Sequence, residues 1–128
     1  MDILMVDCEH SPSGFETLIS QEQAMNGYKA VPFARAPWND FVQIKKLLDT
    51  GMYGILVPYV ETKEEAEKAV AAVKYPPFGV RGVAGSTRAA HFGNNSLGYF
   101  TKANDEVMVF IAIESQKGID NLDGILSV

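Results

Sequence analysis

The sequence predicts an α/β fold in which parallel strands alternate with helices. Three observations lead to this prediction: short apolar runs alternate with amphipathic segments, the runs carry apolar residues at consecutive positions, and turn-forming residues separate the segments. Consecutive apolar residues are typical of strands that are covered on both faces. A repeated strand-helix order implies parallel pairing with right-handed crossovers. Periodicity alone leaves two architectures open, part of a (β/α)8 barrel or a small open sheet.

The first strand-helix unit begins at residues 3–6, an apolar run that is too short for a helix and suits a buried strand. A turn is expected at residues 11–14. Ser13 and Glu16 then have the spacing of a capping box, which predicts the start of a helix. The apolar stripe of that helix is interrupted at Glu22 and consists of Phe15, Leu18, Ile19 and Met25.

The next two units repeat this pattern. Residues 30–34 and 54–60 are predicted strands. Pro37 and Asn39 are expected to open the second helix, whose buried side is predicted to be Phe41, Ile44, Leu47 and Leu48. Capping-box spacing recurs before the third helix, at Thr62 and Glu65, and its stripe is Ala66, Ala69, Val70 and Val73.

The remainder of the chain contains a long glycine-containing segment at residues 76–98, in which Arg81 and Arg88 are expected to be solvated. A short helix is predicted over residues 97–103 and a strand over residues 107–113. A final helix is expected to carry Ile119, Leu122, Ile125 and Leu126.

Composition limits the classes of function. The 128 residues have the length of one domain. The formal net charge is -5 and Lys and Arg form no block, which argues against a nucleic-acid partner. One cysteine and two histidines exclude a disulfide framework and a zinc-finger type of site. No apolar stretch reaches about 18 residues and no basic leader follows Met1. We therefore expect a soluble, cytoplasmic protein with no membrane partner.

Polar residues follow three of the predicted strands. Asp7, Glu9 and His10 follow the first, Arg35 ends the second, and Glu114 ends the fourth. Taken singly, each has a plain structural interpretation, such as a loop cap, a turn histidine, a surface arginine or an exposed acid. Both candidate folds, however, place their sites at the carboxyl ends of strands. An acid for a metal, an arginine for a developing oxyanion and a histidine near neutral pKa together indicate carbonyl chemistry.

Asp49 lies in the last turn of the second predicted helix, where an acid faces the negative end of the helix dipole. A helix of roughly ten residues at about 1.5 Å per residue carries its end to the opposite face of the sheet. Asp49 therefore cannot easily reach His10 of the same chain. It is either a solvated surface acid or a residue that acts on a neighbouring chain.

Five segments of the sequence resemble the HpcH/HpaI aldolases, class II pyruvate-dependent aldolases with a (β/α)8 barrel. They are "VDCEHSP", "ARAPWND", "IKKLLDTG", "GILVPYVETKEEAEKAVAAVKYPPFGVRG" and "IESQKGIDNLDGI", and they span almost the whole chain in family order. The resemblance implies that residues 1–128 form a single partial TIM-barrel domain of the pyruvate/phosphoenolpyruvate type. A full barrel needs about 250 residues. We therefore expect a fragment that lacks the first strand and the last strands of the barrel.

The resemblance also implies roles for individual residues. Glu114 matches a carboxylate ligand of a divalent cation (Mg, Mn or Co), and Asp7 matches a supporting acid near the water shell of that metal. Arg35 matches the arginine that holds the keto or enolate oxygen of pyruvate. His10 matches the histidine that handles protons, and Asp49 matches the acid that pairs with this histidine across a subunit boundary.

The implied function is that of a metal-dependent carbon-carbon lyase, which reversibly cleaves a 4-hydroxy-2-oxo acid to pyruvate and an aldehyde. Small-molecule oxo acids and aldehydes are the implied partners, and a homo-oligomer is expected because an open half barrel exposes two sheet edges and an apolar inner face. Two alternatives stay open. One is a catalytically incomplete half barrel that only binds oxo acids or serves as an assembly module, and the other is a small α/β ligand-binding domain.

Overall fold

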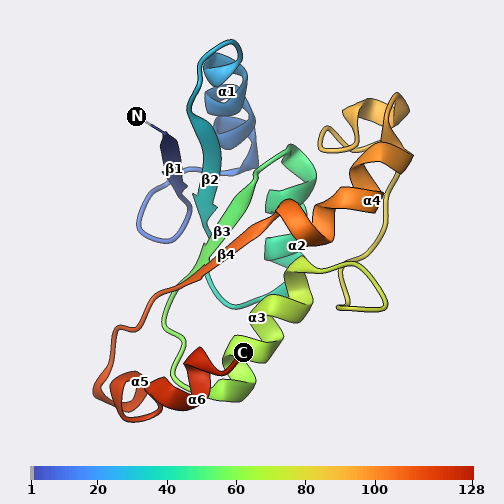
Figure 1. Cartoon of the computed structure of the whole chain (residues 1–128). Coiled ribbons are helices and arrows are strands. Elements are labelled where there is room, and N and C mark those ends of the chain that lie inside the picture. Colours follow the sequence, from blue (N-terminus) through green and yellow to red (C-terminus); the bar gives the residue numbers. More distant parts are fainter. Residues whose placement is uncertain (1) are drawn as a thin grey trace.

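Strands and helices alternate from the beginning of the chain to its end (Figure 1). The computed structural model describes residues 2–128. The elements in chain order are β1 (Ile3–Asp7), α1 (Phe15–Met25), β2 (Val31–Arg35), α2 (Phe41–Thr50), β3 (Gly54–Val57), α3 (Lys63–Val73), the 3-10 helix η1 (His91–Gly93), α4 (Ser96–Glu106), β4 (Met108–Ile111), α5 (Gln116–Asp120) and α6 (Leu122–Leu126). Within residues 2–128, no helix combines the length and the apolar character that crossing a membrane requires.

The strands form a parallel sheet in which they follow one another in chain order, β1-β2-β3-β4. The helices pack on one face of this sheet (Figure 1), where Val6, Ala34 and Ile55 are buried. A doubly wound sheet reverses its strand order and carries helices on both faces. A barrel instead adds its strands in sequence and keeps its helices outside. The observed order therefore supports the barrel and excludes the small open-sheet domain.

The core lies between the sheet and the helices. The sides of α2 and α3 that face the sheet are buried largely as predicted, by Ile44, Leu47, Leu48, Ala66, Ala69 and Val73. The alanines of α3 present little side-chain volume, so this helix can approach the sheet closely. Phe41, which the sequence assigned to the buried side of α2, is exposed. It is the first residue of the helix, where the chain has just left the core.

The starts of α1 and α2 differ from the prediction. α2 begins at Phe41, because the carboxylate of Asp40 accepts a hydrogen bond from the backbone N–H of Gln43 (2.9 Å). A Ser, Thr, Asp or Asn immediately before a helix is the common means of satisfying its first N–H groups. The residue before α1 is Gly14, and within the described chain no side chain caps this helix. The capping box predicted at Ser13 and Glu16 is therefore wrong.

The C-terminal segment forms two short helices, α5 and α6, in place of the single helix that was predicted. The Ser115 hydroxyl oxygen accepts the N–H of Gly118 (3.1 Å) and so begins α5. Ile125 is buried, whereas Ile119 and Leu126 are exposed. The predicted apolar stripe is thus only partly covered.

On the other face of the sheet, the strand register aligns four residues in one row: Met5, Phe33, Gly54 and Met108. Met5 and Met108 are 41% and 50% exposed, whereas Phe33 is 2% exposed. The ring of Phe33 is covered because it lies over Gly54 and against Phe110, with the two ring centroids 5.6 Å apart. In a complete barrel, layers of side chains from further strands fill this interior.

Gly54→Ala tests the packing of this inner face. A Cβ atom at position 54 would lie 2.2 Å from Cε2 of Phe33. We expect overpacking to lower the free energy of unfolding by about 1–3 kcal/mol, measured by urea denaturation. The matched control is Gly85→Ala, because the nearest atom to its Cβ is the Ser96 hydroxyl at 3.7 Å. The control should change stability by less than about 0.5 kcal/mol. Equal effects of the two substitutions would contradict the close approach at Gly54.

Candidate functional site

Asp7 and Arg35 lie side by side at the carboxyl ends of β1 and β2, where the strand register pairs them directly. The guanidinium of Arg35 donates from Nε to Oδ1 of Asp7 (2.9 Å) and from Nη2 to Oδ2 (2.5 Å). This two-point contact fixes the plane of the guanidinium. Hydrogen bonding from Arg35 lowers the pKa of Asp7 well below its usual range, although partial burial opposes this shift. The Asp7 side chain is therefore a carboxylate near neutral pH.

The loop after β1 folds back onto the same carboxylate. Oδ1 of Asp7 also accepts the backbone N–H groups of Glu9 (2.9 Å) and His10 (3.2 Å). The Glu9 carboxylate then lies 3.1 Å from Nη1 of Arg35 and 3.6 Å from Nε2 of His10. Glu9 thus bridges the arginine and the histidine. The sequence placed Glu9 at this rim but assigned it no role, and the alternation of polar residues in "VDCEH" is the signal that marks it.

Glu114 follows β4 and reaches the neighbouring loop after β3. Its Oε2 accepts the backbone N–H of Tyr59 (3.0 Å). The pKa of Arg35 is raised, first by its hydrogen bond with Asp7 and also by the negative charges of Glu9 and Glu114. The structure therefore brings together Asp7, His10, Arg35 and Glu114 at one end of the sheet.

Among residues 2–128, no cluster of three or more His, Cys, Asp or Glu side chains has a geometry that holds a metal ion. Both oxygens of Asp7 are engaged by Arg35. Glu114 has one oxygen on Tyr59, and within the described chain no hydrogen bond reaches its other oxygen. A hard cation such as Mg²⁺ is often held by one or two carboxylates together with substrate oxygens. Glu114 fits the role of one such ligand.

Asp49 occupies the last turn of α2, away from the rim formed by Asp7, Arg35 and Glu114. Its Oδ1 accepts a hydrogen bond from Nη2 of Arg81 in the same chain (2.9 Å). The Arg81 side chain is fully buried, with its guanidinium carbon 4.5 Å from the centre of the Tyr75 ring. The expectation that Arg81 is solvated is therefore wrong. As predicted from the helix length, Asp49 does not meet His10 within one chain.

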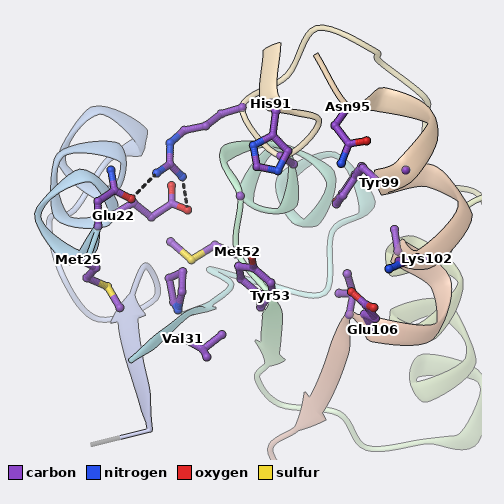
Figure 2. Close-up of a pocket in the computed structure, with 18 of the residues that line it drawn as sticks. Glu22, Met25, Val31, Met52, Tyr53, His91, Asn95, Tyr99, Lys102 and Glu106 are labelled. Atoms are coloured by element: carbon purple, nitrogen blue, oxygen red, sulfur yellow. Dashed lines mark hydrogen bonds and ion pairs between the residues drawn. The ribbon is translucent and has the colours of Figure 1, made fainter. Parts of the chain in front are cut away.

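A cavity of about 1030 Å³ lies at the amino-terminal ends of the strands, opposite the rim (Figure 2). Glu22 lies in its wall, and its Oε1 is 2.7 Å from Nη1 of Arg88. Arg88 also donates to the carbonyl of Thr50 (2.7 Å), which ties the glycine-containing loop to α1 and α2. Burial raises the pKa of Glu22. The residue that interrupts the predicted stripe of α1 is thus a buried ion-pair partner, and Arg88 is not a freely solvated arginine.

Asp7→Asn tests the ion pair with Arg35. The folded-state pKa of Asp7 lies below the value of about 3.9 for an unperturbed aspartate. The carboxylate therefore stabilises the fold above about pH 4, and this contribution is lost as pH falls through the lower pKa of the folded state. We expect Asp7→Asn to lower the urea midpoint near neutral pH and the two proteins to converge in acid.

The matched control for this comparison is Asp105→Asn, which removes an exposed acid near the end of α4. It should leave the pH profile of the urea midpoint close to that of the unmodified chain. A constant difference between Asp7→Asn and the unmodified chain down to strong acid would contradict the assigned ion pair.

Comparison with known proteins adds to this geometry. The HpcH/HpaI aldolase/citrate lyase family model matches residues 1–128. The 5-keto-4-deoxy-D-glucarate aldolase of Escherichia coli is 48% identical over 124 residues, which make up 97% of this chain and 48% of that relative. The chain thus spans about half the length of the curated relatives it matches.

Two solved structures share the fold. An HpcH/HpaI aldolase/citrate lyase family protein from Burkholderia cenocepacia J2315 superposes with a TM-score of 0.91 at 35% identity, covering 97% of this chain and 50% of that one. An HpcH/HpaI aldolase from Desulfitobacterium hafniense DCB-2 gives a TM-score of 0.88 at 31% identity, covering 100% and 49%. These likenesses confirm the predicted fold class of a partial aldolase barrel. The chain belongs to the HpcH/HpaI aldolase/citrate lyase family.

Proposed function

We propose that this chain supplies one part of the active site of a metal-dependent aldolase, which reversibly cleaves a 4-hydroxy-2-oxo acid to pyruvate and an aldehyde. The observation that supports this most directly is the fixed orientation of Arg35 by Asp7 and Glu9, at the rim that also carries Glu114. The names of its relatives support an aldolase that acts on small oxo acids. The proposed location is the cytoplasm.

Arg35 is the proposed binding group for the oxo or enolate oxygen. A guanidinium carries five N–H groups. Its contacts to Asp7 and Glu9 leave donors on Nη1 and Nη2 that can meet a substrate oxygen. Because Asp7 and Glu9 hold the guanidinium before substrate arrives, little reorganisation is needed as negative charge develops.

Glu114 is the proposed ligand of a divalent cation such as Mg, Mn or Co. When bound, such a cation supplies Lewis-acid stabilisation of the enolate. Asp7 supports this role of Glu114 indirectly. Its carboxylate is paired with Arg35 and holds the Arg35 guanidinium near Glu114. Further metal ligands would come from protein outside residues 2–128 or from the substrate.

His10 is the proposed proton-handling group. Its side chain is 72% exposed at the rim, and the Glu9 carboxylate lies 3.6 Å from Nε2. A carboxylate at this distance restricts the orientation of the imidazole ring. In an oligomer, Asp49 of a second copy is a further candidate partner for His10, since Asp49 does not reach the rim of its own chain.

Exchange of the methyl protons of pyruvate with solvent tests this chemistry. The exchange proceeds through the enolate and needs no aldehyde. We expect Mn²⁺-dependent exchange that falls roughly 100- to 10,000-fold in His10→Asn and about 100- to 1,000-fold in Arg35→Ala. The matched control is His91→Asn, the other histidine, which lies in η1 beside the cavity at the opposite end of the sheet. Equal exchange in the His10 and His91 variants would count against the proposed role. Exchange no faster than the uncatalysed reaction in every protein, with or without Mn²⁺, would favour a non-catalytic assembly module.

We also propose that the chain forms a homo-oligomer in solution. The exposed apolar side chains on the inner face of the sheet include Ile3, Met5, Met108 and Phe110, and apolar patches of this kind favour association. Gel filtration with light scattering at micromolar concentration should give a mass above that of one 14.0 kDa chain. Met108→Lys, which places a charge on the inner face, should shift the mass toward the monomer. A monomeric mass for the unmodified chain would refute the proposal.

A further inference from the structure

Tyr59 has a backbone conformation that is unusual for its residue type. Its φ is 56°, in the left-handed region, where a non-glycine residue is uncommon and strained. The residues on either side, Pro58 and Val60, are buried. The strain is therefore confined to one residue between two buried neighbours.

Hydrogen bonds between the two loops explain where the Tyr59 amide points. Beyond the ends of β3 and β4, Ala112 donates its N–H to the carbonyl of Val57 (2.9 Å), and Val60 donates to the carbonyl of Ala112 (3.2 Å). The pairing thus skips the two residues between Val57 and Val60. With the φ of Tyr59 in the left-handed region, the chain rejoins the ladder at Val60, while the N–H of Tyr59 lies outside the ladder and donates to Oε2 of Glu114 (3.0 Å).

The ring of Tyr59 lies on the only tryptophan of the chain. The centroids of Trp38 and Tyr59 are 6.1 Å apart with an interplanar angle of 25°, a stacked arrangement. Trp38 belongs to the loop after β2, which begins directly beyond Arg35. An offset-stacked aromatic pair stabilises a structure beyond the effect of its buried area, so this pair offsets part of the strain in the Tyr59 backbone.

We propose that Trp38 and Tyr59 are positioning residues for Glu114: the stacked rings hold the Tyr59 backbone in its left-handed conformation, and the Tyr59 N–H holds the Glu114 carboxylate at the rim beside Arg35. The use of this carboxylate as a metal ligand rests on the proposed function. The hydrogen bond itself and its dependence on Trp38 do not.

Other contacts keep the two loops folded without Trp38. The Glu61 carboxylate accepts hydrogen bonds from the Ser115 hydroxyl (2.6 Å) and from Nζ of Lys117 (3.0 Å). The side-chain amide of Asn121 donates to the carbonyl of Glu61 (2.9 Å). Because Trp38 is itself 55% exposed, its replacement should loosen Tyr59 and leave these contacts in place.

The first experiment measures hydrogen exchange of the Tyr59 amide by NMR, in the protein without added metal. We expect protection of this amide to fall roughly 3- to 10-fold in Trp38→Ala, the factor that corresponds to loss of one aromatic stack. Trp38→Phe should retain most of the protection, because a phenyl ring can still stack. Tyr28→Ala, which removes an exposed tyrosine in the turn after α1, is the matched control and should change nothing.

The second experiment titrates the same proteins with Mn²⁺ by calorimetry. The dissociation constant should rise by a similar factor in Trp38→Ala and be restored in Trp38→Phe, a rescue that general loss of stability would not produce. Unchanged Tyr59 protection in Trp38→Ala would overturn the positioning role, whether or not metal binds. Reduced protection together with no Mn²⁺ binding to any variant, including the unmodified chain, would support the positioning of Glu114 and refute the metal part of the proposed function.

Discussion

Parallel pairing of the strands in chain order is the constraint on which the rest of the structure depends. Each strand lies beside the one before it, so every crossover must return along the same face and all helices collect there. This arrangement places every strand-to-helix loop at one end of the sheet. Residues as distant in sequence as Asp7 and Glu114 therefore share a rim, while the loops that precede the strands surround the cavity at the other end.

At the rim, one arginine stands among several acids. Arg35 contacts Asp7 and Glu9 directly and is influenced by Glu114. The acids therefore outnumber the positive charge, and a cation bound at Glu114, as proposed, would restore the balance. Of these acids, Asp7 is already paired with Arg35, and its carboxylate orients the guanidinium. Glu114 is the exposed acid of the group.

Much of this arrangement is predictable from sequence because it depends on local patterns. Strand positions follow from the apolar runs, and the residues at the strand ends follow from the strand positions, which is why Asp7, His10, Arg35 and Glu114 could be named together. The exact start of α2 was missed because Asp40 and Asn39 are both capable caps, and only the path of the chain selects between them.

Contacts between distant segments were not predictable in this way. Glu22 interrupts an apolar stripe and Arg81 and Arg88 lie in a glycine-containing loop, so each looks solvated when judged by its neighbours in sequence. Their partners are 66 residues away for Glu22 and Arg88, and 32 for Arg81 and Asp49. Only the folded chain shows that these charges are paired and that Glu22 and Arg81 are fully buried. The conformation of Tyr59 was missed for a similar reason, since its amide partner lies on another loop.

One member of each of these ion pairs is fully buried, and this makes the two ends of the sheet respond differently to dissolved salt. Mobile ions screen charges that are in contact with water much more than charges that are buried. The Asp7 and Arg35 side chains are 35% and 24% exposed, whereas the side chains of Arg81 and Glu22 are fully buried. High ionic strength therefore weakens the electrostatic hold on Arg35 while the loop at the opposite end stays anchored. The rim at Asp7 and Arg35 is therefore the more salt-sensitive end of the sheet.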